Sequence, residues 1–356
     1  MTSTRFTIDE LPPPVQDASA WYGPALAARA DWLELVNDAE VAEIEAASRA
    51  LIERGADLAQ LRAADFPLPT LAPRLARVLH ELLEGRGLVL LRGLPVLRWP
   101  RSLSAAAFLG LGTHLGRMRP QNAAGHVLGH VRDVGLSAKD PNVRIYQTHE
   151  RQTFHTDSCD VVGLLCLQTA RSGGLSALVS STTIYNEMRA RRPDLAALLF
   201  EPVATDRRGE VPPGAKPYFE IPVFNWFGGR LSTIYQRQYI DSAQRFDAAP
   251  RLEPAHVEAL DLFDRLANDP ALMMTMALQP GDMQFVHNHS LLHDRTAFTD
   301  WPDGARRRHL LRLWLAPPGA RALPPVYAQR YGNVEPGGRG GIVLQAQTLT
   351  VPLQEL

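Results

Sequence analysis

The chain has few cysteines and no long hydrophobic run. Cys159 and Cys166 are its only cysteines, too few for the disulfide framework of a small secreted domain. Both lie in an apolar stretch, where we expect small core residues and neither ligands nor nucleophiles. No apolar run approaches the roughly 18 residues of a membrane-spanning helix, and the first residues have no apolar signal-peptide core. We therefore expect a cytoplasmic protein without a membrane partner.

An excess of charge of either sign is also absent. The 356 residues include 37 basic and 38 acidic ones, for a net charge of −1, so nothing draws the whole protein to nucleic acid or to an anionic membrane. With 45% hydrophobic and 21% charged residues, the composition is that of an ordinary globular protein with a large core.

Periodicity predicts helices first and strands later. Amphipathic spacing predicts helices over 37–55, 71–87 and 102–118, and the apolar run 87–96 predicts a buried strand. From about residue 125 short strands follow, with helical patterns at 182–199 and 253–269 and a Gly-Gly hairpin at 222–235 between them. Strands return at 277–293 and 307–317. This order predicts an α+β fold with a β-sandwich or barrel core.

No linker divides the chain into independent domains. We expect residues 1–84 to form an N-terminal helical extension packed on the core, and residues 85–356 to form the core domain. A mixed helical insert is expected at about 183–270. Together these parts should make one structural unit.

The stretch "FHTD" places His155 and Asp157 two positions apart. In an extended segment such residues point to the same side, so both could reach one metal ion. Two histidines and one carboxylate on one face of an iron ion leave three neighbouring positions open for a co-substrate and O₂. The triplet alone is weak evidence, because it is common by chance and is usually a solvated turn.

Three histidines offer the third ligand: His287, His289 and His293. Alternation along a strand does not choose among them. Residues 288–290, Asn-His-Ser, break the apolar pattern, and we expect a turn there. A strand beginning at Leu291 would then carry His293, which is our predicted ligand. His287 and His289 are interpreted as polar residues at a strand edge.

An arginine pair follows in the apolar stretch "RRHLLRLWL", at Arg308 and Arg312. A buried arginine in such a strand needs an anion, because an unpaired buried charge is costly, and a guanidinium binds a carboxylate through two parallel hydrogen bonds. A dicarboxylate such as 2-oxoglutarate could chelate the metal and place its distal carboxylate on Arg308. Internal Asp or Glu partners are the alternative.

The motifs "FHTD", "SGGLSALVSS", "GDMQFVHNHSLLHDRTAF" and "RRHLLRLWL" together resemble those of the taurine dioxygenase-like (TauD/TfdA, clavaminate synthase-like) oxygenases, over roughly residues 85 to 318. The resemblance implies a double-stranded β-helix, or jelly-roll, core and Fe(II) bound by His155, Asp157 and His293. It also implies 2-oxoglutarate and O₂ as co-substrates. The family's Gly-Gly-acidic-Thr turn appears as "GGLS", so Ser176 matches the hydroxyl that helps Arg308 hold the distal carboxylate. Leucine for the acidic residue and serine for threonine are departures.

The activity implied is oxidative decarboxylation of 2-oxoglutarate to succinate and CO₂, coupled to hydroxylation of an unactivated C–H bond. Desaturation and ring closure are variants, whereas halogenation needs a small residue in place of the carboxylate ligand and is disfavoured by Asp157. Two other classes stay open at this point. A zinc hydrolase could use the same triad, and a non-catalytic jelly-roll could bind a small molecule.

The substrate is not identified by the sequence. Arg312 could contact a substrate anion or support the 2-oxoglutarate pocket. Four extended residues separate it from Arg308 by about 13 Å, which favours the substrate side and hence a substrate with an acidic group. Segments expected to overhang the open end offer further contacts for a small to medium organic molecule with an apolar part: Tyr146, Gln152, Tyr218, Phe224 and Trp226. Each of these could instead be packing. Assembly into a homo-oligomer is left open.

Overall fold

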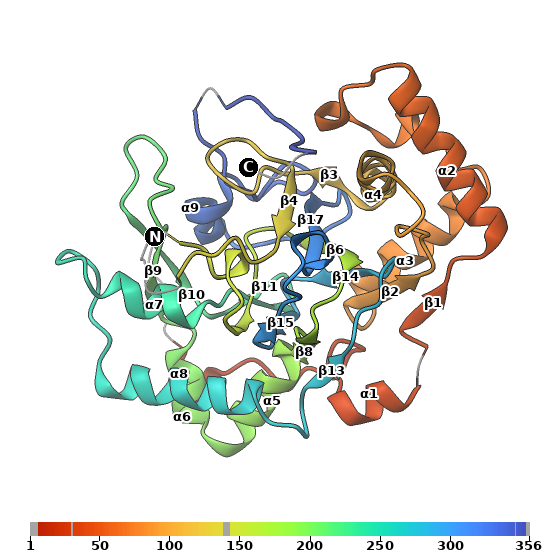
Figure 1. Cartoon of the computed structure of the whole chain (residues 1–356). Helices are drawn as coiled ribbons and strands as arrows, with labels where there is room; N and C mark the ends of the chain where they lie inside the picture. The colour runs from red at the N-terminus through yellow and green to blue at the C-terminus, as the bar shows by residue number, and fades with distance from the viewer. Residues whose placement is uncertain (1–5, 30, 138–142, 346, 354–356) are drawn as a thin grey trace.

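Two β-sheets face one another at the centre of the molecule (Figure 1). The computed structural model describes residues 6–29, 31–137, 143–345 and 347–353. The larger sheet has the strand order β1-β2-β14-β6-β17-β3, with β4 also pairing with β17, and the smaller has the order β13-β8-β15-β5. Their strands are β1 (Leu33–Leu35), β2 (Leu88–Arg92), β3 (Arg117–Met118), β4 (Leu128–Val131), β5 (Gln152–His155), β6 (Val161–Gln168), β8 (Ser176–Ser180), β13 (Met274–Met276), β14 (Met283–His287), β15 (Leu291–Arg295) and β17 (His309–Ala316).

Six short strands form separate pairs. They are β7 (Ser172–Gly173) with β16 (Phe298–Thr299), β9 (Pro202–Asp206) with β10 (Tyr218–Pro222), and β11 (Phe224–Phe227) with β12 (Arg230–Thr233). The last pair is the predicted Gly-Gly hairpin. Gly228 and Gly229 both have positive φ, 58° and 76°, which is the backbone that a two-residue turn of type I′ requires.

The alternation of side chains along the strands divides the core into layers. In β2, Leu88 and Leu90 point between the two sheets, whereas Val89 and Leu91 point outward to the helices. The two sets fall on opposite faces because successive residues of a strand do so. Antiparallel pairing holds throughout the two sheets except between β1 and β2. The double-stranded β-helix core is confirmed.

Helices cover the outer face of each sheet (Figure 1). Those over the larger sheet are α2 (Asp38–Glu53), α3 (Ala72–Glu84) and α4 (Arg101–Leu115), and those over the smaller sheet are α5 (Ser181–Arg191), α6 (Pro193–Leu198) and α8 (Pro254–Ala267). The remaining helices are α1 (Gly23–Arg29), α7 (Arg237–Ala243) and α9 (Ala328–Tyr331). The predicted start of α2 is confirmed: Asn37 Oδ1 accepts from the Glu40 N–H at 3.0 Å and the Glu40 carboxylate accepts from the Asn37 N–H at 3.0 Å, a capping box.

Three local expectations differ from the structure. The helix expected over 182–199 is divided into α5 and α6, because Pro193 lacks an N–H and disfavours helical backbone at Arg192. The first 84 residues are not purely helical, since β1 joins the larger sheet beside β2. Residues 145–147 form one turn of 3₁₀ helix where a strand was expected.

Two other expectations can be checked against burial and helix length. Cys159 and Cys166 are unpaired and fully buried, as predicted for core residues. Within the described ranges, none of the helices is both long and apolar enough to cross a membrane.

Candidate active site

Two histidines meet across neighbouring strands of the smaller sheet. His155 is the last residue of β5, and His293 is the middle residue of β15. The two are directly opposite in the antiparallel register, so their rings lie 4.1 Å apart between centroids. The turn predicted at residues 288–290 is present, and β15 begins at Leu291 as expected.

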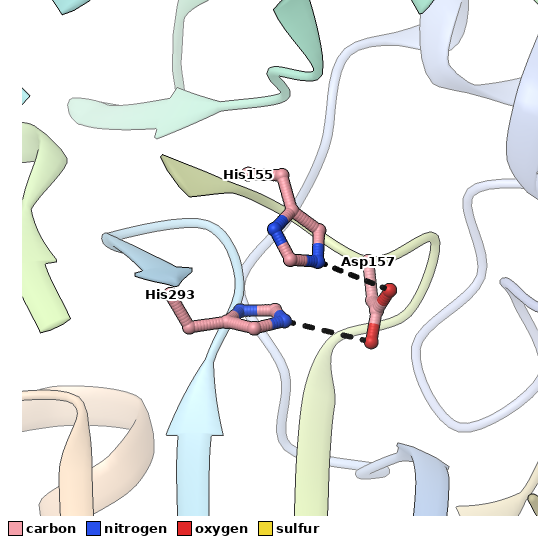
Figure 2. A group of neighbouring side chains, drawn as sticks. All are labelled: His155, Asp157 and His293. Atoms are coloured by element: carbon pink, nitrogen blue, oxygen red, sulfur yellow. Dashed lines mark ion pairs between the residues drawn. The ribbon is translucent and has the colours of Figure 1, made fainter. Parts of the chain in front are cut away.

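Asp157 completes the cluster from the loop after β5. Its Oδ1 lies 4.0 Å from Nε2 of His155 and its Oδ2 lies 3.7 Å from Nε2 of His293 (Figure 2). One ligand atom from each of the three residues lies within 4.8 Å of the others. The Asn288 Oδ1 accepts from the Asp157 N–H at 3.0 Å, so the turn before β15 also fixes this loop. Two imidazoles and one carboxylate on one side suit a divalent iron or zinc ion.

The protonation states of the three side chains suit metal binding. The Thr153 carbonyl accepts from Nδ1 of His155 at 2.8 Å, which leaves Nε2 as the ligand atom. Burial lowers the pKa of both imidazoles, that of His293 to about 3. Burial alone would raise the pKa of Asp157, but the charge of Arg312 and the nearby histidines outweigh it and hold that pKa at about 2. A neutral His pair and an ionised carboxylate are the ligating forms.

Arg312 lies directly behind Asp157. Its Nη1 is 3.4 Å from Asp157 Oδ2, and its Nε donates to Gln121 Oε1 at 2.7 Å. The same Asp157 oxygen accepts from Trp314 Nε1 at 2.9 Å, and the guanidinium stacks on Tyr146 with Cζ 4.7 Å from the ring centroid. Arg312 therefore already has an ion-pair partner inside the protein, the carboxylate of Asp157.

The sequence predicts His287 and His289 at a strand edge, and the structure shows that this prediction is wrong. Both are fully buried, because the turn between β14 and β15 folds inward behind the loop that carries Asp157. His289 Nε2 lies 2.7 Å from Asp160 Oδ1, and Arg339 Nη2 lies 2.8 Å from the same oxygen. Asp160 thus pairs with the Arg339 guanidinium and shares a hydrogen bond with His289, and these contacts support the loop from behind.

One pocket beside the cluster contains an unpartnered arginine. This Arg308 pocket is lined by His155, His293, Arg308 and Ser176 among others. Arg308 is only 5% exposed. Among the described residues, no carboxylate lies within ion-pair distance of its guanidinium, and no hydrogen-bond partner contacts its Nη1. Burial lowers its pKa to about 10. Arg308 itself lies one residue before β17 and not within the strand.

The glycine turn before β8 shapes the same pocket. Gly174 has φ 68°, and a Cβ there would come within 3.0 Å of Arg308 Nε, so a side chain at this position would collide with the guanidinium. Ser176 Oγ donates to Gln284 Oε1 at 3.0 Å, and both residues line the pocket. The hydroxyl predicted from "GGLS" is thus beside Arg308.

A second pocket opens from the other side of the cluster. This Arg330 pocket is lined by His155, Asp157, Arg144 and Arg330 among others. The space not filled by protein atoms, including the part open to solvent, is about 670 Å³. The two pockets share four lining residues, which are Tyr146, Gln152, His155 and Arg312.

The other expected substrate contacts lie elsewhere. Phe224 is fully buried in the core between the smaller sheet and its helices, and Trp226 lines a surface pocket with Phe227. Neither lines the Arg308 pocket or the Arg330 pocket. The Tyr218 hydroxyl donates to the Ala248 carbonyl at 2.6 Å. The structure brings Tyr146 and Gln152 to the metal cluster and leaves these three aromatic residues away from it.

Several residues of the site were not found from the sequence. Asn288 and Gln121 act through long-range hydrogen bonds. Gln284 is one polar residue in an apolar strand, and Arg144 and Arg330 lie in segments without a motif. Gln284 carried a usable signal, because a buried amide in β14 needs a polar partner. No comparable pattern in the sequence marks Arg144 or Arg330 as a pocket residue.

Comparison with known proteins places this geometry in a family. Residues 54–314 match the family model "Taurine catabolism dioxygenase TauD, TfdA family". The chain is 34% identical over 325 residues to the FR-33289 synthase of Streptomyces rubellomurinus, covering 89% of this chain and 94% of that protein. It is 32% identical over 323 residues to the taurine hydroxylase-like protein SAT17 of Stachybotrys chartarum, covering 86% and 82%.

A solved structure shares the fold. Asparagine oxygenase in complex with Fe(II), (2S,3S)-3-hydroxyasparagine and succinate superposes with a TM-score of 0.61 at 20% identity, over 80% of this chain and 93% of that one. The family match includes His155, Asp157 and His293, and it also includes Arg308 and Arg312. The chain belongs to the TauD/TfdA family and is an Fe(II)- and 2-oxoglutarate-dependent dioxygenase.

Proposed function

We propose that His155 and His293, through Nε2, and Asp157, through its carboxylate, bind the catalytic Fe(II). The convergence of these donors supports the assignment, since no other group of three His, Cys, Asp or Glu ligands comes together in the described part of the chain. Held by these three residues, Fe(II) would supply, together with 2-oxoglutarate and O₂, the oxidant for the C–H bond, and 2-oxoglutarate would be converted to succinate and CO₂.

Arg308 and Ser176 are proposed to hold the distal carboxylate of 2-oxoglutarate. The observation that carries this assignment is the buried, unpartnered Arg308 guanidinium in a pocket that also contains His155 and His293. A carboxylate there would receive two parallel N–H donors and relieve the cost of the buried charge. The Ser176 hydroxyl has one proton, which it donates to Gln284 Oε1 in this structure, so binding of the carboxylate would require that proton to turn from Gln284 to the co-substrate.

The prime substrate is proposed to be a small to medium organic molecule with an acidic group, hydroxylated in the Arg330 pocket. Three arginines line this pocket, Arg144, Arg312 and Arg330, against the single carboxylate of Asp157. Iron on Asp157 would make the local charge still more positive. His155 and Asp157, which line the pocket, are buried, so a substrate seated there would keep bulk water from the reacting C–H bond.

A succinate-release screen tests this function. Reconstituted enzyme with Fe(II) and 2-oxoglutarate should release succinate slowly alone and faster with an acidic substrate. The panel would contain amino acids, sulfonates, betaines and secondary metabolites, with neutral analogues as matched controls. The product should gain one oxygen atom, traced with ¹⁸O₂ by mass spectrometry. A protein that binds Fe(II) yet neither binds nor decarboxylates 2-oxoglutarate would contradict the proposal.

Replacing Arg312 by leucine should weaken Fe(II) binding by about 10- to 100-fold, the usual cost of losing a partner of a metal ligand. The reason is the contact with Asp157, which would keep only the Trp314 indole. Uncoupled 2-oxoglutarate decarboxylation and substrate-dependent succinate release should fall together. Anaerobic Fe(II) titration and both rates measure this.

The conservative change Arg312→Lys is the matched control, because it retains the charge beside Asp157 and should recover part of the metal affinity. If Arg312→Leu instead bound Fe(II) normally and only raised KM for the prime substrate, the guanidinium would be a substrate contact and not a positioning residue.

A further inference from the structure

The Arg330 pocket contains a positive charge, the Arg330 guanidinium, that makes no ion pair with the proposed metal ligands, all of which lie in the described part of the chain. Arg330 comes from α9, after the last core strand, and is half-buried at the pocket wall. Its Nε donates to Ser158 Oγ at 2.8 Å, and its Cζ lies 5.6 Å from the ring centroid of Phe219. Within the described ranges, no carboxylate lies at ion-pair distance from it. A guanidinium held this way has donors left for a ligand.

Arg144 adds a second guanidinium from a different segment. It precedes the 3₁₀ turn 145–147 and lines the same pocket. Its charge is shared with Glu210, which pairs with Nη2 but is not among the lining residues. The side chain is 16% exposed. The pocket wall therefore presents two guanidinium groups, and Glu210, which pairs with Arg144 and also attracts Arg330, is not among the lining residues.

Hydroxyl and aromatic groups complete this part of the pocket. Ser158 and Tyr239 line it beside the arginines, and Phe219 and Trp314 supply apolar surface. Two forked cations with nearby hydroxyl donors are suited to an oxyanion. Apolar walls suit a short carbon chain.

Arg312 is less suited to this task, although it also lines the pocket. Its Nε is bonded to Gln121 and its Nη1 faces Asp157, so a substrate anion would compete with the metal-binding carboxylate. Arg330 has no such competitor in the described part of the chain.

We propose that Arg330, with Arg144 beside it, binds the anionic headgroup of the prime substrate, an assignment that rests on the proposed function. The ligand class is a short organic acid bearing a phosphate-type, sulfonate or carboxylate group. Ser158, which bonds Arg330, directly follows Asp157 in the chain, and Arg330 lines the same pocket as His155 and Asp157. A substrate with its headgroup on Arg330 would therefore occupy the pocket that the proposed metal ligands also line, and the carbon that reaches those residues would be the one oxidised.

The test uses the holoenzyme with Mn(II) in place of Fe(II) and saturating 2-oxoglutarate. Methylphosphonate, methanesulfonate and acetate are the three probes, and isothermal titration gives the Kd of each. Wild-type enzyme should bind at least one probe, and Arg330→Gln should weaken that probe by about tenfold or more, as expected for losing a charged hydrogen-bond partner. The affinity for 2-oxoglutarate should not change.

Arg77→Gln is the control. Arg77 is exposed on α3 and is not among the residues that line the Arg330 pocket, so probe binding should stay at the wild-type value. Arg144→Gln is a second variant that keeps the test valid if Arg330→Gln does not fold. It should weaken the probe less, because Arg144 already shares its charge with Glu210.

Two results would overturn the inference: no probe binding by the wild type, or equal binding by wild type, Arg330→Gln and Arg144→Gln. Failure of the proposed function is distinguishable, because it would appear as absent 2-oxoglutarate binding in the wild-type Mn(II) enzyme before any probe is added.

Discussion

Replacing His155 or His293 by alanine is expected to abolish Fe(II) binding and, with it, 2-oxoglutarate turnover. Either change leaves two of the three side chains that converge within 4.8 Å. Loss of a residue that merely orients a ligand costs about 10- to 100-fold in metal affinity, so loss of the ligand itself should exceed that range. Anaerobic Fe(II) titration and the visible absorption of the iron–2-oxoglutarate chelate measure the effect.

Two other histidines serve as comparisons. His149 has a 59% exposed side chain, and His149→Ala should bind iron normally. His289→Ala should destabilise the fold, because it removes a buried partner of Asp160, while the folded fraction still binds iron. If His289→Ala lost the metal and His293→Ala kept it, the third ligand would have been assigned to the wrong strand position.

Arg308→Ala should raise the apparent KM for 2-oxoglutarate by about 30- to several-thousand-fold. Truncating one partner of a desolvated charge pair costs about 2–5 kcal/mol, and each factor of ten corresponds to about 1.4 kcal/mol. Arg308 is 5% exposed, so the full cost of leaving the co-substrate carboxylate without its partner should appear. Steady-state succinate formation against 2-oxoglutarate concentration measures it.

The adjacent Arg307 provides a matched control, because its side chain is exposed. Arg307→Ala removes the same charge one residue away and should leave KM unchanged. Equal 2-oxoglutarate affinity in wild type and Arg308→Ala would show that the distal carboxylate binds elsewhere.

Local patterns in the sequence were sufficient to predict that His155, Asp157 and His293 come together. The apolar alternation of β14 stops at residues 288–290 and resumes at Leu291, and these features place His293 on the strand beside β5. His155 is the last residue of β5, whereas Asp157 lies in the loop that follows, so the alternation of a strand predicted the position of the first and not of the second. The strands β2, β14, β15 and β17 and the longer helices were predicted because burial imposes a period on each of them.

Contacts between distant segments could not be predicted in this way. The pairing of Arg312 with Asp157 joins residues 155 positions apart, and no local pattern encodes it. The distance argument that assigned Arg312 to the substrate considered only its own strand and not the loop that folds over it. The hairpin aromatics Phe224 and Trp226 were expected at the open end, yet their strands pack in the layer of helices over the smaller sheet.

Arg330, the proposed substrate contact, and the proposed iron ligands come from different parts of the chain. Arg330 lies on α9, beyond residue 314, where the family match ends, whereas the proposed iron ligands come from β5, β15 and the loop after β5. The loop after α9 is nevertheless tied to the core, because the buried Arg339 pairs with Asp160 behind the loop that carries Asp157. Exchange of the whole segment between relatives would therefore disturb the support of that loop, whereas exchange of the Arg330 side chain alone would change the proposed substrate contact and leave the Arg339 ion pair in place.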